Sequence, residues 1–181
     1  EALWKALLDD RLDVIATDHA PHTLIEKGYG PNSNGSTPPL LGFPGKGTIE
    51  DLGRGQGLYE QAHAGLPLVQ HALLLMLHYH KQGRISMEKI AQKMSHAVAD
   101  CFEIENRGYI REGYFADLVV VDNHLPSTVT KENILYKCGW SPLENFTFPA
   151  SIQNTFVNGR MVYDNGKFDE SSKGQRLLFN R

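Results

Sequence analysis

The 181-residue chain is 41% hydrophobic, and its 18 basic and 21 acidic residues give a formal net charge of −3. This length is enough to bury a core in one domain or in two small ones. Positive and negative residues are interspersed, so the charge pattern favours neither nucleic acid nor a membrane surface as a partner. The two cysteines lack C-x-x-C spacing, and we find no apolar run of ~18 residues and no leader pattern. We therefore expect a cytoplasmic globular protein.

The first third of the chain combines a helix, a strand and a long connection. Apolar residues at positions 3, 4, 7 and 8 predict a helix over residues 1–8, and the apolar run 14–17 predicts a buried strand. Glycine and proline then punctuate residues 24–57, which is typical of a functional lid or a disordered segment. Gly45–Thr48 superficially resembles a phosphate-binding loop, but the full motif and the preceding strand are absent.

The remaining sequence predicts a helical hairpin followed by a small β unit. Apolar periodicity indicates one helix after Pro67 and a second after Ser86, which is a suitable N-cap residue. Residues 116–122 read as a short buried strand. Two further strands, 151–157 and 160–163, flank Asn158-Gly159, a dipeptide that favours a two-residue hairpin turn.

The predicted strand 14–17 ends in a cluster of polar residues. Asp18, His19 and His22 follow it directly, with Pro21 between the two histidines. A buried strand that stops in this way often delivers its last side chains into a site at the mouth of a sheet or barrel. Asp18 is therefore the first candidate for a functional residue.

These motifs carry a family resemblance. Asp18–His22 after a strand, together with Gly65–Leu68 and Gly83–Ser86 at two helix starts, resembles the end of the amidohydrolase barrel of dihydroorotases. Residues 108–122 resemble the return strand of the family's β-sandwich, and residues 136–142 and the Asn-Gly hairpin resemble the tail of bacterial dihydroorotases. The resemblance covers nearly the whole chain except residues 24–61.

The resemblance implies an α/β fold that is the C-terminal part of a larger one. Residues 1–103 would supply the last strand, a loop and helices of a TIM-like (β/α)8 barrel, and residues 104–181 a β-sandwich segment and tail. A complete barrel takes ~250 residues, so this chain would need a missing N-terminal barrel portion or a companion chain. A homo-oligomer is also possible on this interpretation.

The resemblance also implies an activity and a set of site residues. Dihydroorotases interconvert dihydroorotate and N-carbamoyl-aspartate in pyrimidine synthesis, using one or two zinc ions to activate water. Asp18 matches the acid that binds metal and acts first as general base and then as general acid. His22 matches the histidine that donates to the substrate carboxylate, and Pro21 would aim it toward the site. The backbone near Ala64 and Gly65 matches the segment that meets the substrate's ring amide.

Each assignment has a structural alternative. Asp18 could cap a helix or a turn, with His19 and His22 as solvent-exposed residues of a loop. We favour a structural role for His19 in either case. His78 and His80 have metal-ligand spacing, but two residues apart on a helix they do not face each other. We interpret Asp117 as a turn residue, and we interpret four histidines as surface or core-edge residues: His63, His71, His96 and His124.

Several family features are absent from their expected context. These are an H-x-H pair on the first barrel strand, a lysine or acid that bridges the metals, and two histidines on middle strands. Two alternatives to a dihydroorotase therefore stay open. One is a hydantoinase- or allantoinase-like cyclic amidase, and the other is a non-catalytic amidohydrolase-like interaction module.

Overall fold

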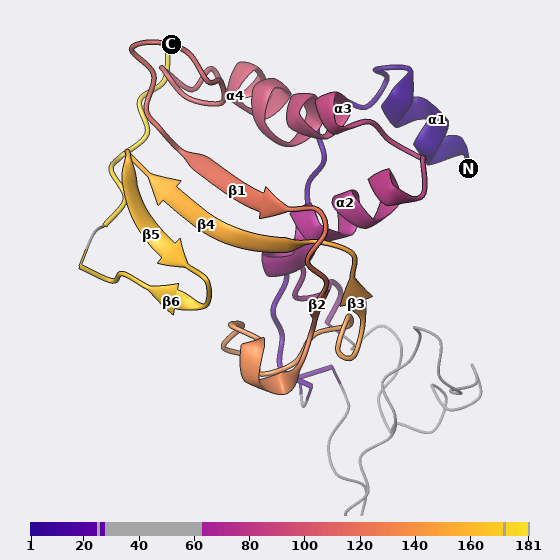
Figure 1. Ribbon diagram of the computed structural model, residues 1–181. Helices are drawn as coiled ribbons and strands as arrows, with labels where there is room; N and C mark the ends of the chain where they lie inside the picture. The colour runs from indigo at the N-terminus through magenta and orange to yellow at the C-terminus, as the bar shows by residue number, and fades with distance from the viewer. Residues whose placement is uncertain (25, 28–62, 172, 181) are drawn as a thin grey trace, which may run out of the picture. The chain divides into compact units, whose positions relative to one another are not determined.

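The computed structural model describes residues 1–24, 26–27, 63–171 and 173–180, and Figure 1 shows their elements in chain order. The lid or disordered segment expected at 24–57 and the Gly45–Thr48 motif therefore lie almost wholly outside the described residues. The chain forms two compact units. The first comprises residues 1–16, 73–127 and 148–181, and the second comprises residues 17–72 and 128–147. The predicted division after residue 103 concerns a larger fold and stays a prediction.

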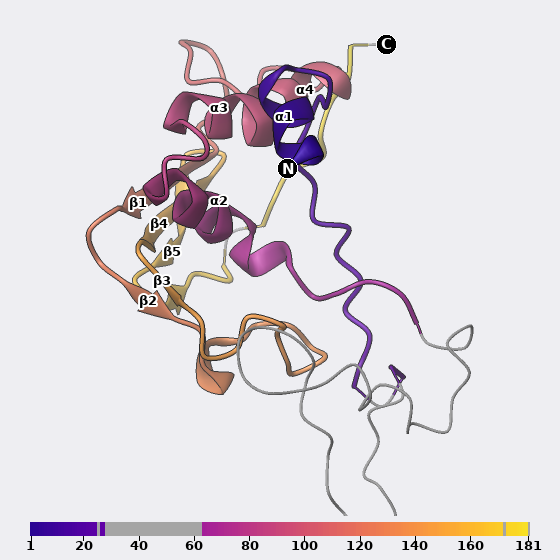
Figure 2. The ribbon, with the colours of Figure 1, turned by 90° about the vertical axis from the view of Figure 1, so that its right-hand side faces the viewer.

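The first unit begins with helix α1, Ala2–Leu8, as the sequence predicts. Figures 1 and 2 show α1 next to α3. The turn after α1 is held there by Lys93, whose Nζ donates to the Leu12 carbonyl at 2.6 Å and contacts Asp10 at 2.9 Å. Lys93 is only 2% exposed, and a buried ammonium group needs such polar partners. Its two contacts therefore fix the start of the chain against η4, Gln92–His96.

The predicted helical hairpin is confirmed. The short 3-10 helix η3, Val69–His71, leads into α2, Ala72–Lys81. After a turn, α3 (Met87–Ala91), the π-helix η4 (Gln92–His96) and α4 (Ala97–Cys101) follow one another without a break. Ser86 caps this stretch, because its side chain accepts a hydrogen bond from the Lys89 backbone N–H at 3.1 Å. Buried side chains on both arms include Leu74, Met76, Leu77, Ile90 and Ala99.

The same unit holds a four-stranded antiparallel sheet in the order β1-β4-β5-β6. Its strands are Leu118–Asp122, Ser151–Val157, Arg160–Asp164 and Lys167–Phe168. The predicted turn Asn158-Gly159 joins β4 to β5, with φ of 52° and 78°, which explains the need for these residue types. A second Asn-Gly pair, at 165–166, makes the β5–β6 turn and was not predicted.

Strand β1 is less buried than the sequence predicts. Val119 and Val120 are 48% and 45% exposed, although the run of three valines indicated a buried strand. The physical reason is position, because β1 is an edge strand that pairs only with β4 in the described sheet.

The prediction of a strand at residues 14–17 is also wrong. Within the described residues they belong to no sheet. Among the described residues, their backbone hydrogen bonding runs from Ile15 N–H to the Lys93 carbonyl at 3.0 Å. A strand needs a partner along its length, and here the first pairing comes only at an isolated parallel bridge between His19 and Leu66.

The second unit packs around buried residues of its C-terminal segment. Val129, Tyr136, Trp140 and Leu143 are each 8% exposed or less. The two-residue strands β2, Ser127–Thr128, and β3, Thr147–Phe148, pair at its ends. Between them, the 3-10 helix η5, Lys131–Asn133, begins with a capping box formed by Thr130 and Asn133.

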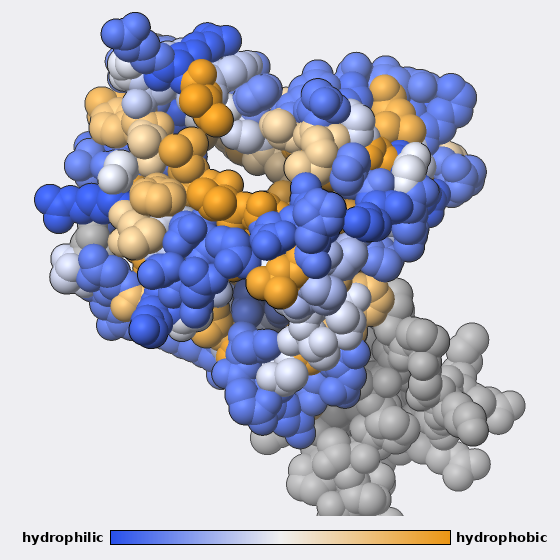
Figure 3. All heavy atoms as spheres, viewed as in Figure 1, coloured by the Kyte–Doolittle hydropathy of each residue, from blue (hydrophilic) through white to orange (hydrophobic). Residues whose placement is uncertain are grey.

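The surface carries hydrophobic side chains among the hydrophilic ones (Figure 3). Exposed large hydrophobic residues of the sheet include Val119, Val120, Met161 and Phe168. Within the described part of the chain, every helix is too short or too polar to cross a membrane.

Candidate active site

The structure brings together the two segments to which the sequence assigns site residues. Beyond the His19–Leu66 bridge, the Ala20 N–H donates to the Leu66 carbonyl at 3.1 Å. Gly65 makes this approach possible. It has a φ of +88°, and a Cβ built on it would lie 2.4 Å from the Ala20 Cβ and 3.7 Å from the Asp18 carbonyl oxygen. Residues 18–20 and 64–66 therefore lie side by side.

Asp18 lies at the turn where the extended segment ends. Its φ of +46° is in the left-handed region, which aspartate tolerates better than most residues. The residue is exposed, and its carboxylate has no hydrogen-bond or ion-pair partner among the described residues. The side chain is thus available to solvent and to a ligand.

His19 has a structural role. Its Nδ1 accepts hydrogen bonds from the backbone N–H groups of Leu68 and Val69, at 3.1 and 3.3 Å. These groups lie at the start of η3, so His19 caps that helix and contributes no free acceptor at Nδ1. Its ring also lies against Tyr136, with centroids 5.3 Å apart.

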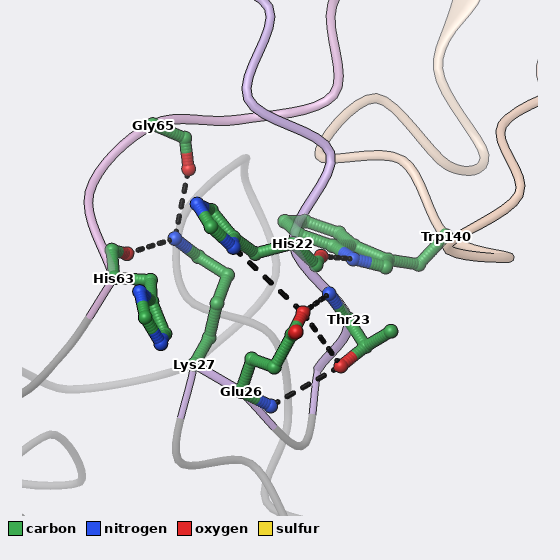
Figure 4. A network of polar contacts seen from close by, with 7 residues as sticks. All are labelled: His22, Thr23, Glu26, Lys27, His63, Gly65 and Trp140. Carbon is green, nitrogen blue, oxygen red and sulfur yellow. Dashed lines mark hydrogen bonds and ion pairs between the residues drawn. The ribbon is translucent and has the colours of Figure 1, made fainter.

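His22 is held from three sides (Figure 4). Its Nδ1 lies 3.7 Å from a carboxylate oxygen of Glu26, and its ring stacks on His63 with centroids 4.5 Å apart and 17° between the planes. Its carbonyl oxygen accepts a hydrogen bond from the indole N–H of buried Trp140 at 2.9 Å. The ring itself stays partly exposed, at 35%.

Glu26 and Lys27 complete this network (Figure 4). The Glu26 carboxylate accepts from the Thr23 backbone N–H at 2.7 Å and from the Thr23 hydroxyl at 3.0 Å. These two bonds, with smaller contributions from His22 and His63, hold the pKa of Glu26 below its usual value. The Lys27 ammonium donates to the carbonyls of His63 at 2.6 Å and Gly65 at 2.8 Å.

Four members of the network were not singled out by sequence reasoning: Glu26, Lys27, His63 and Trp140. The spacing of His22 and Glu26 is a usable signal, because residues four apart on one helical turn are neighbours. His63 had no local signal, since its partner His22 lies 41 positions earlier. Our interpretation of His63 as a surface or core-edge histidine did not include this stacking. Trp140 lies in the tail motif 136–142, but nothing in the sequence indicates its bond to His22.

A buried tyrosine supports the segment behind His19. The Tyr136 hydroxyl accepts from the Gln70 backbone N–H at 3.0 Å and lies 3.2 Å from Nδ1 of His71. Burial raises the pKa of Tyr136 and lowers the pKa of His71. Both groups are therefore neutral near pH 7, as a buried hydrogen-bonded pair requires.

The described residues do not make a complete metal site. Among them no three His, Cys, Asp or Glu side chains come together in a way that could hold an ion. Asp18 offers a suitable carboxylate, but by itself it is one ligand of the three or four that zinc takes from a protein. His78 and His80 are used elsewhere, since His78 Nε2 contacts Gln82 at 2.7 Å and His80 Nδ1 contacts the Ile85 carbonyl at 2.9 Å.

Comparison with solved structures finds the same fold in proteins described as hydantoinases and dihydropyrimidinases. The chain superposes on D-hydantoinase (dihydropyrimidinase) from Thermus sp. with a TM-score of 0.74 and 21% identity, covering 93% of this chain and 32% of that one. Dihydropyrimidinase from Brevibacillus agri gives a TM-score of 0.70 at 20% identity, covering 92% and 32%. At this level of identity the likeness concerns the fold.

Comparison with curated sequences gives a consistent result. The chain is 28% identical to dihydroorotase from Pyrococcus furiosus over 98% of its own length and 34% of the relative's. It is 34% identical to dihydroorotase from Halobacterium salinarum over 91% of its length and 32% of the relative's. It thus spans about a third of these relatives. Residues 1–162 match the family model described as "Amidohydrolase family". The chain belongs to the amidohydrolase family.

Proposed function

We propose that this chain is part of a dihydroorotase, the C-terminal portion, and carries half of the active site. The enzyme would interconvert dihydroorotate and N-carbamoyl-aspartate in the cytoplasm. The strongest support is the segment Asp18–His22, which lies beside Gly65 at the end of an extended stretch, in a chain whose similar relatives are named dihydroorotases.

In this proposal the residues of the chain divide the work. In the hydrolytic direction, water adds to the ring carbonyl and the bond between the carbonyl carbon and the ring nitrogen breaks. The Asp18 carboxylate takes the proton from that water and returns it to the departing nitrogen. His22 donates a hydrogen bond to the substrate carboxylate, and the backbone of Ala64 and Gly65 meets the ring amide.

The described residues supply few of the ligands that a metal site would need. Zinc, as one or two ions, would polarise the carbonyl and lower the pKa of its bound water. Asp18 would be one ligand, and the others would come from outside the described residues, since these gather no group of three. The missing barrel portion, on the same or a companion chain, is the proposed source.

The test compares the chain alone with a hybrid protein that contains it. In the hybrid, the chain replaces the third of the Pyrococcus furiosus dihydroorotase to which it aligns, and both proteins are assayed for dihydroorotate hydrolysis and bound zinc. We expect the hybrid to be active and Asp18→Ala to lower its kcat by a factor of ~10² or more. Asp13→Ala is the matched control, because Asp13 is an exposed carboxylate five residues earlier.

The alternatives give different results in the same assay. A hydantoinase-like enzyme would hydrolyse rings without a carboxylate, and His22→Asn would leave that activity intact. A folded hybrid with no activity on any cyclic amide would contradict the proposal and favour a non-catalytic module. Activity of the chain alone, lost with Asp18→Ala, would mean that the chain or its oligomer supplies all the ligands.

A further inference from the structure

We propose that Glu26 and Lys27 are positioning residues of the substrate site, Glu26 for the His22 ring and Lys27 for the backbone at Ala64–Gly65. The inference rests on the proposed function, in which His22 and that backbone bind the substrate. It goes beyond the proposed function because neither Glu26 nor Lys27 has a role there.

The Glu26 side chain is itself held in place by hydrogen bonds with Thr23. The Thr23 backbone N–H and the Thr23 hydroxyl both donate hydrogen bonds to the Glu26 carboxylate and so fix its position. In return, the Glu26 backbone N–H donates to the Thr23 hydroxyl at 3.2 Å. This reciprocal arrangement has the pattern of a capping box over one turn of chain. A side chain anchored in this way presents its charge in one place.

That place is beside Nδ1 of His22 (Figure 4). A carboxylate 3.7 Å from Nδ1 favours the ring orientation in which Nδ1 faces it and Nε2 faces away. His63 stacks on one side of the ring and limits its rotation. In that orientation Nε2 is the ring nitrogen left to face the substrate carboxylate.

Lys27 acts on the other half of the site. Its ammonium bridges the His63 and Gly65 carbonyls, on either side of Ala64, although these residues lie 36 and 38 positions away in sequence. Those bonds turn the two carbonyls toward Lys27 and so set the orientation of the peptide groups between them. The adjacent residues Glu26 and Lys27 thus connect His22 and the 63–65 backbone through one short turn.

The first experiment needs no ligand and uses the 181-residue chain. NMR follows the ring nitrogens of His22 and the exchange rate of the Ala20 amide, which bonds to Leu66. We expect Glu26→Gln, which keeps an oxygen for Thr23, to shift both His22 ring-nitrogen resonances and weaken the ring contact with His63. We expect Lys27→Met to accelerate Ala20 exchange about tenfold, since two charged hydrogen bonds are lost. Lys27→Arg should restore most of that protection.

Glu144→Gln and Lys137→Met serve as matched controls, because their side chains have no polar partner among the described residues of the same unit. Both should leave His22 and Ala20 unchanged. Unchanged His22 resonances in Glu26→Gln and unchanged Ala20 exchange in Lys27→Met would overturn the inference, whatever the chain binds.

The second experiment connects positioning to the ligand. Dihydroorotate and dihydrouracil, the same ring without its carboxylate, are titrated into the hybrid enzyme described above. We expect Glu26→Gln to weaken dihydroorotate binding at least about threefold and to leave dihydrouracil unaffected. Equal weakening of both ligands would contradict the role of Glu26. A hybrid that binds neither ligand would overturn the proposed substrate, while the ligand-free measurements still decide the positioning.

Discussion

Gly65 is the residue that permits the close contact between the Asp18–Ala20 and Ala64–Leu66 segments. We expect Gly65→Ala to destabilise the second unit more than Gly139→Ala does. Both glycines have positive φ, +88° and +73°, so alanine is strained at either position by about 1 kcal/mol. Only Gly65 would also place its Cβ 2.4 Å from Ala20, and this overlap adds about 1–3 kcal/mol.

The free energies of unfolding are compared by urea denaturation, followed through the fluorescence of Trp140 in a Trp4→Phe background. Trp140 belongs to the second unit and Trp4 to the first, so the remaining signal reports on the unit that contains both glycines. Equal destabilisation by the two substitutions would mean that the segments separate at little cost.

The ion pairs of Asp10 with Lys89 and Lys93 should make the stability of the protein depend on pH. Hydrogen bonds from Lys89 and then Lys93 lower the pKa of Asp10 below the ordinary 3.8. A carboxyl group whose pKa is lower in the folded state stabilises the protein above the unfolded-state pKa, and this contribution disappears as the pH falls through the folded-state pKa. We therefore expect wild-type stability to fall more steeply than that of Asp10→Asn below about pH 4.

The measurement is Tm against pH for the two proteins between pH 7 and pH 2. Asp10→Asn should be less stable at pH 7, and the difference should shrink toward pH 2. A constant difference across this range would show that the two lysines do not stabilise the charged form of Asp10.

At the scale of elements, Arg107 joins the segment before β1 to the β4–β5 hairpin. Its guanidinium, 8% exposed, donates to Asp117 and, at 2.7 Å, to the Asn158 side chain, and it lies 4.1 Å from the Phe115 ring centroid. Asp117 also accepts from the Asn158 backbone N–H at 2.7 Å. The interpretation of Asp117 as a turn residue is confirmed, and the turn that it stabilises is the Asn-Gly turn 41 residues later.

We expect Arg107→Lys to lower the free energy of unfolding by about 1–2 kcal/mol and Arg107→Ala by about 2–4 kcal/mol. Lysine keeps a charge for Asp117 but loses the forked geometry and the stacking on Phe115. Urea denaturation followed by far-UV circular dichroism provides the comparison, with exposed Arg160→Ala as the control. A lysine variant as stable as the wild type would show that charge alone holds the hairpin.

For the whole molecule, local sequence patterns predicted the helices and turns, but they did not predict the pairing and burial that depend on segments distant in the sequence. The helices and the Asn-Gly hairpin follow from periodicity, capping and turn residues, all of which act over a few positions. The exposure of β1 and the absence of a strand at 14–17 depend on which segments lie alongside them. The same limit applies to the site, where Asp18 and His22 form one recognisable motif but Trp140 reaches His22 from 118 positions away.

The unpaired segment 14–17 offers a test at this largest scale by amide hydrogen exchange. In β4, which pairs with both β1 and β5, we expect slow exchange. Val14, Ala16 and Thr17 should exchange orders of magnitude faster, and Ile15 at an intermediate rate because its N–H bonds to Lys93. If the segment pairs as a strand once the missing barrel portion is present, the same amides should become as slow as β4 in the hybrid enzyme, where neighbouring strands are supplied. Slow exchange in the chain alone would instead indicate that a second copy pairs with this segment, and fast exchange in both proteins would contradict that pairing.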